Sequence, residues 1–172
     1  MPRIIIVGGP NGAGKTTFAS AYLSIDRDVT ALVNADEISR ELEEQGLPEA
    51  IRNVRAARAM LRRIDGLVDS STDLVIETTL ASLAYAQKIP VWQRKGYHVA
   101  LIYFRLLNPE QSIERVRRRV AAGGHGIPEV VIRRRFARSL RYLEHYYKAI
   151  VNEWEIWESL EGDFQRAKAW DA

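Results

Sequence analysis

Apolar residues gather in four short runs along the chain, separated by longer stretches in which they recur at helical spacing. Each run is rich in β-branched side chains and predicts a buried strand. The four runs cover residues 4–7, 30–33, 73–77 and 98–104. Helices are predicted between them, at residues 49–68 and 82–95. This alternation predicts an α/β fold with a mainly parallel sheet flanked by helices.

Two more helices are predicted after the fourth strand. Asn108-Pro109-Glu110 supplies an N-cap, a first-position proline and a first-turn acid, which predicts a helix through about residue 122. The glycine-rich turn at residues 123–126 ends it. Pro128-Glu129 then opens a helix through about residue 150.

Residues 154–158 are compatible with either a strand or a helix; we favour a short last strand, paired in a hairpin with residues 164–167. The 172 residues suit a single domain, 1–172, in which the paired helices at about 108–141 form a lid.

The glycine-rich segment between the first strand and the next helical stretch fits the phosphate-loop pattern G-x-x-x-x-G-K-[ST] of the P-loop NTPase fold. Its backbone N–H groups and the following helix N-terminus are suited to bind phosphate oxygens. Lys15 is expected to reach the β- and γ-phosphates, and the Thr16 hydroxyl to hold Mg²⁺. The predicted nucleotide-binding residues are Gly9, Pro10, Asn11, Gly12, Ala13, Gly14, Lys15, Thr16 and Thr17.

Two acidic residues follow the next strands, and ligands bind at the carboxyl ends of parallel strands. Asp36 is a candidate base that accepts the proton of an attacking hydroxyl, or else a helix cap. Glu77 is a candidate ligand of Mg²⁺ through water or of a substrate hydroxyl, alongside Thr78; the alternative is a solvated or salt-bridged residue.

The predicted lid is strongly basic, with nine arginines against three glutamates between residues 110 and 141. Arginine has a permanent charge and a bidentate fork, which suit a transferring phosphoryl group. Two arginines are expected to reach the phosphates, because neighbours on a helix point in different directions. The rival interpretation is a nucleic-acid-binding face. The aromatic residues Phe136, Tyr142, Tyr146 and Tyr147 follow helical spacing and are expected in the core.

Composition narrows the function classes. The chain has no cysteine, which excludes a thiolate metal site or a cysteine nucleophile. Its N-terminus lacks the pattern of a signal peptide, and no apolar run is long enough to span a membrane, so a cytoplasmic protein is expected. A net charge of +3 suits anionic ligands in general without indicating nucleic acid.

The phosphate loop, Asn34-Ala35-Asp36, Glu77-Thr78-Thr79 and the Gly123-Gly124-His125 turn together resemble the zeta-toxin family and its predicted ATPase or kinase relatives. The resemblance covers about residues 3–145. It implies ATP- or GTP-dependent phosphorylation of a small-molecule hydroxyl, which in the toxins belongs to a UDP-activated N-acetylamino sugar. It also implies an antitoxin protein as partner.

By this resemblance Lys15 and Thr16 take the phosphate and metal roles, and Asp36 is the base. Arg119 and Arg135 are the lid arginines that act in the transition state, and His125 is a candidate contact to the substrate, although a lone loop histidine is more often structural.

Two other function classes stay open. One is an ATPase without a small-molecule acceptor, although the Leu-Ser-Gly-Gly-Gln signature of transporter cassettes is absent. The other is a nucleic-acid-associated NTPase that uses the arginine-rich helices.

Overall fold

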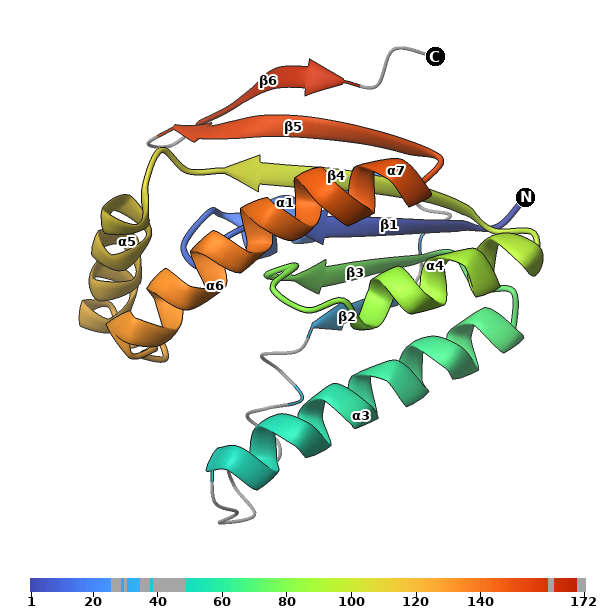
Figure 1. The fold of residues 1–172 in the computed structure, drawn as a ribbon, viewed down its shortest axis with the longest axis horizontal. Helices are drawn as coiled ribbons and strands as arrows, with labels where there is room; N and C mark the ends of the chain where they lie inside the picture. The colour runs from blue at the N-terminus through green and yellow to red at the C-terminus, as the bar shows by residue number, and fades with distance from the viewer. Residues whose placement is uncertain (26–28, 30, 35–37, 39–48, 161–162, 170–172) are drawn as a thin grey trace.

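The computed structural model describes residues 1–25, 29, 31–34, 38, 49–160 and 163–169. They contain a six-stranded sheet in the order β2-β3-β1-β4-β5-β6 (Figure 1). The strands are β1 (Arg3–Gly8), β2 (Ala31–Asn34), β3 (Leu74–Thr78), β4 (His98–Arg105), β5 (Glu153–Leu160) and β6 (Asp163–Ala169). The first five run parallel, and β6 returns antiparallel to β5.

The helices are α1 (Lys15–Ile25), α3 (Glu49–Asp69), α4 (Ala84–Arg94), α5 (Pro109–Ala121), α6 (Glu129–Tyr142) and α7 (Lys148–Ile150). A π-helical turn, η1 (Leu143–Tyr147), joins α6 to α7. In Figure 1, α1 lies behind the sheet, whereas α3, α4 and α6 lie in front of it. The predicted α/β fold of the P-loop NTPases is therefore confirmed.

The alternation of side chains along β1 separates two hydrophobic cores. Ile4 and Ile6 belong to a core that α3 and α4 complete on one face. Ile5 and Val7 point to the other face, where they belong to a core with Ala19 of α1. Because all four are buried, β1 is central in the sheet and fixes where the loop after it lies.

The four predicted strands lie within one or two residues of the observed ones, and the C-terminal hairpin is confirmed. The helix predicted from residue 129 to about residue 150 is confirmed as a continuous helical segment, which the π-helical turn η1 divides into α6 and α7. Within η1, the Tyr147 hydroxyl donates to the Ser82 carbonyl from a buried position.

Of the aromatic residues expected in the core, Phe136 and Tyr147 are buried, but Tyr146 is 46% exposed. Among the described residues, no helix combines the length and apolarity needed to cross a membrane.

Candidate active site

The phosphate loop lies between the end of β1 and the start of α1. The Ala13 N–H donates to Pro10 O at 3.3 Å, which closes the turn. Lys15 folds back over the loop, and its Nζ donates to the same carbonyl at 2.9 Å. Lys15 is only 7% exposed despite its charge. The loop therefore presents a buried cation and a helix N-terminus to one space, an arrangement that favours a bound phosphate.

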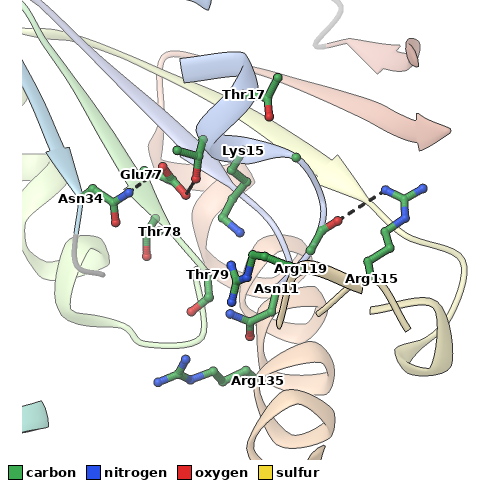
Figure 2. A pocket seen from close by; sticks show the side chains of 13 residues that line it. Asn11, Lys15, Thr17, Asn34, Glu77, Thr78, Thr79, Arg115, Arg119 and Arg135 are labelled. Atoms are coloured by element: carbon green, nitrogen blue, oxygen red, sulfur yellow. Dashed lines mark hydrogen bonds between the residues drawn. The ribbon is translucent and has the colours of Figure 1, made fainter. Parts of the chain in front are cut away.

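A cavity of about 320 Å³ opens beside this loop (Figure 2). Four cations and one carboxylate contribute to its wall, so its charge suits an anionic ligand. The lining residues are Asn11, Gly12, Gly14, Lys15, Thr16, Thr17, Asn34, Glu77, Thr78, Thr79, Arg115, Arg119 and Arg135.

Glu77 lines the cavity and is held in place by residues from two other elements. The Thr16 hydroxyl donates to Glu77 Oε1 at 2.9 Å, and Asn34 Nδ2 donates to Glu77 Oε2 at 2.9 Å. Glu77 is 5% exposed, so its carboxylate orientation is fixed by these partners. Parallel pairing of β2 with β3 places Asn34 level with Glu77.

The oxygen atoms of Thr16 and Glu77 fit a magnesium ion, which prefers hard oxygen ligands and keeps several waters. Among the described residues, no group of three or more His, Cys, Asp or Glu side chains gathers elsewhere to hold a metal. The Thr16–Glu77 pair lies beside the phosphate loop, so its oxygen atoms and a bound phosphate could share one Mg²⁺.

A metal role for Glu77 predicts the effect of Glu77→Gln. The amide keeps the size of the side chain but loses the charge, so we expect the apparent affinity for Mg²⁺ to fall about tenfold. Nucleotide turnover titrated with Mg²⁺ measures this. Glu114→Gln, an exposed glutamate paired with Arg118, is the matched control. An unchanged Mg²⁺ dependence in folded Glu77→Gln would contradict the metal role.

The loop after β3 lies on the other side of Lys15 from Thr17 (Figure 2). Thr78 Oγ1 accepts a hydrogen bond from the Leu80 N–H at 3.1 Å, and buried Leu80 adopts a φ of +57°. This turn holds Thr78 and Thr79 at the cavity wall. The Thr78 hydroxyl is engaged by this turn, and Thr79 is the neighbouring hydroxyl side chain that lines the cavity.

Six of the nine arginines of α5 and α6 fall into two groups. Arg115, Arg119 and Arg135 line the cavity. The three glutamates of this segment each pair with an arginine that does not line the cavity: Glu114 with Arg118, Glu129 with Arg117, and Glu110 with Arg133. The hydrogen bond from Arg133 lowers the pKa of Glu110. The glutamates therefore form salt bridges with exposed arginines that do not line the cavity.

The Gly-Gly-His turn supports Arg119 through its backbone. Arg119 Nη2 donates to the His125 carbonyl at 2.9 Å. A Cβ on Gly124 would lie 2.6 Å from Arg119 Cγ, so the turn packs directly against this side chain. His125 is exposed and does not line the cavity.

Asp36 lies outside the described residues. The structure brings most of the other predicted site residues to one cavity, whereas Gly9, Pro10, Ala13 and His125 do not line it. Sequence reasoning missed Arg115 as a site residue. Arg115 and Arg119 are four residues apart on α5 and therefore share a helix face, a spacing that could have identified the pair.

Comparisons with known proteins agree with this fold. A structure of the PezAT chromosomal toxin-antitoxin system of Streptococcus pneumoniae matches with a TM-score of 0.68 and 21% identity, over 98% of this chain and 72% of that chain. A structure from the Pnkp1/Rnl/Hen1 RNA repair complex has a TM-score of 0.69 and 21% identity, over 85% of this chain and 46% of that chain. A gluconokinase from Sinorhizobium meliloti 1021 has a TM-score of 0.55 and 16% identity, over 92% of this chain and 83% of that chain.

At these levels of identity the similarities show a shared fold, and the proteins with this fold include a kinase. The family comparison reaches further, because residues 4–145 match the AAA domain family AAA_33 and so include the phosphate loop, Glu77 and the cavity-lining arginines. The chain therefore belongs to this AAA domain family.

Proposed function

We propose that the protein is a phosphotransferase that moves the terminal phosphoryl group of ATP or GTP to a hydroxyl of a small molecule. One observation carries this proposal. A single cavity is lined by the phosphate loop, the Thr16–Glu77 pair and arginines from two helices. Phosphoryl transfer depends on this combination of phosphate binding, metal and arginine charge.

In the proposed reaction, the loop N–H groups and Lys15 bind the nucleotide phosphates. Thr16 and Glu77 would hold Mg²⁺, which would neutralise charge at the phosphates. The acceptor oxygen forms a bond to the γ-phosphorus as the bond from that phosphorus to the bridging oxygen breaks. Asp36 takes the hydroxyl proton, and the nucleoside diphosphate leaves. Arg119 and Arg135 stabilise the negative charge of the transferring group.

The acceptor would lie beside Thr78 at the end of β3 and Thr79 in the loop that follows, both of which line the cavity. A UDP-activated N-acetylamino sugar is the first acceptor to test, because the resemblance to zeta toxins implies it. The likeness in fold to the toxin-antitoxin structure also supports a test for an antitoxin protein as partner.

A mass-spectrometric screen tests the function directly. Metabolite pools, UDP-sugars and short RNA or DNA are incubated with the protein, Mg²⁺ and ATP or GTP. We expect one small molecule to gain the mass of one phosphate in the presence of the wild-type protein and not with Lys15→Ala. Nucleotide hydrolysis with no phosphorylated product would favour an ATPase, and a phosphorylated RNA or DNA end would favour a nucleic-acid kinase.

Lys15→Ala should lower ATP affinity or turnover at least tenfold. Its buried ammonium is lost from the loop, and a hydrogen bond to a charged group contributes about 1.5–3 kcal/mol. Calorimetric titration with ATP and steady-state turnover measure the loss. Lys95→Ala removes a lysine that is paired with Asp69 at the far end of α4 and should change neither. Unchanged ATP binding and turnover in folded Lys15→Ala would remove the basis of the proposal.

A further inference from the structure

Three segments that are distant in the sequence meet on the outer side of the phosphate loop. Arg115 of α5 donates through Nη1 to Ser159 Oγ at 2.6 Å and through Nη2 to Ser159 O at 2.9 Å. The same Nη1 donates to the Gly12 carbonyl at 3.4 Å. Figure 2 shows Arg115 turned toward the loop, on the side away from Glu77. One guanidinium thus joins the loop to β5.

The loop is also packed closely against these segments. A Cβ on Gly12, where φ is +77°, would lie 2.9 Å from Arg115 Cβ. A Cβ on Gly14, where φ is +84°, would lie 2.8 Å from Cζ of Phe164 in β6. Both glycines combine a left-handed backbone with a close neighbour, so these contacts constrain the path of the loop.

The contacting groups are themselves held in place. Ser159 is 4% exposed, and buried Ser112, one turn before Arg115, donates its hydroxyl to the Asn11 carbonyl. The Phe164 ring packs at 4.9 Å from Phe104 and 6.4 Å from Phe18, measured between ring centroids. The outer side of the loop is therefore supported by fixed side chains.

We propose that Arg115 and the β5–β6 hairpin form a clamp that holds the phosphate loop in its phosphate-binding shape. Arg115 is then a positioning residue that acts through Gly12, and the hairpin contributes to nucleotide binding by supporting the loop. The hairpin lies beyond residues 4–145, so this support comes from outside the segment that matches the family. The proposal rests on nucleotide binding, which is part of the proposed function.

The clamp predicts a specific binding pattern. Loop N–H groups and Lys15 grip the β-phosphate as well as the γ-phosphate, so a displaced loop should weaken ADP and ATP alike. A direct contact from Arg115 to the γ-phosphate would instead weaken ATP alone. Comparing the two nucleotides therefore separates positioning from direct contact.

The experiment measures Kd for Mg·ADP and Mg·ATP by calorimetry, and KM and kcat for nucleotide turnover, in Arg115→Met. We expect both Kd values and KM to rise about tenfold, because three hydrogen bonds from a charged group are lost, while kcat at saturating ATP changes less than about threefold. Arg115→Lys, which keeps one charged donor, should restore part of the affinity. Arg117→Met, an exposed neighbour on α5, should leave all four values unchanged.

Two milder variants test the hairpin even if Arg115→Met does not fold. Ser159→Ala removes one of the three acceptors, and Phe164→Leu removes the ring that packs on Gly14; each should weaken ADP and ATP by equal factors. Melting without nucleotide checks that the variants are folded.

Loss of ATP affinity with ADP affinity intact, a large fall in kcat at saturation, or unchanged binding in folded variants would each overturn the clamp while leaving the proposed function standing. A folded wild-type protein that binds neither nucleotide would overturn both.

Discussion

Arg119→Ala and Arg135→Ala should each lower kcat for phosphoryl transfer on the order of 10³-fold, the effect of removing an arginine that stabilises the transferring group. Both side chains line the cavity, and they come from different helices, α5 and α6. Their positive charge stabilises the transition state, in which the phosphoryl group moves from the leaving oxygen to the acceptor oxygen, more than it stabilises bound ATP. ATP affinity should therefore change much less than kcat. Single-turnover transfer and calorimetric ATP binding measure the two effects.

Arg117→Ala and Arg134→Ala are the matched controls on the same helices. Arg117 pairs with Glu129 and has a 70% exposed side chain, and Arg134 is exposed and does not line the cavity. A nucleic-acid face predicts a different pattern, with similar small losses at all four positions and affinity that falls steeply with salt. Affinity for RNA and DNA at two salt concentrations, together with the kinetics of the four variants, separates the two interpretations.

Asp36→Asn should leave ATP binding nearly unchanged and lower phosphoryl transfer roughly 10²-fold or more, the usual contribution of a positioned base. The amide retains the shape and the capping ability of the side chain but cannot accept the proton. Rapid-quench measurement of transfer, with calorimetry of ATP binding, tests this. Transfer at the normal rate would identify Asp36 as a helix cap.

Glu77 is the next candidate base in that case, and the two residues can be told apart by metal dependence. Glu77 contacts Asn34 and Thr16, and Thr16 is the proposed magnesium ligand. Excess Mg²⁺ should therefore restore part of the activity of Glu77→Gln and none of the activity of Asp36→Asn. Restoration of both variants by Mg²⁺ would contradict the separate roles.

The sequence alone determined the features that are local in the chain. The phosphate loop occupies consecutive residues, and the period of apolar positions is set by neighbouring side chains, so the motif, the parallel strands and the C-terminal hairpin could be predicted. The Asn108 cap of α5 is equally local, and its side chain accepts from the Gln111 N–H as expected. The π-helical turn η1 could not be predicted in this way, since nothing in its local pattern separates it from a regular helix.

Only the tertiary structure decided which side chains of the arginine-rich helices reach the cavity. Nine arginines have the same chemistry, and the choice depends on how α5 and α6 pack against the loop and on which arginines the glutamates engage. The contacts from Asn34 to Glu77 and from Arg115 to Ser159 and Gly12 span 43, 44 and 103 residues of sequence. No local pattern encodes them, because strand register and helix packing, which are properties of the whole fold, bring these residues together.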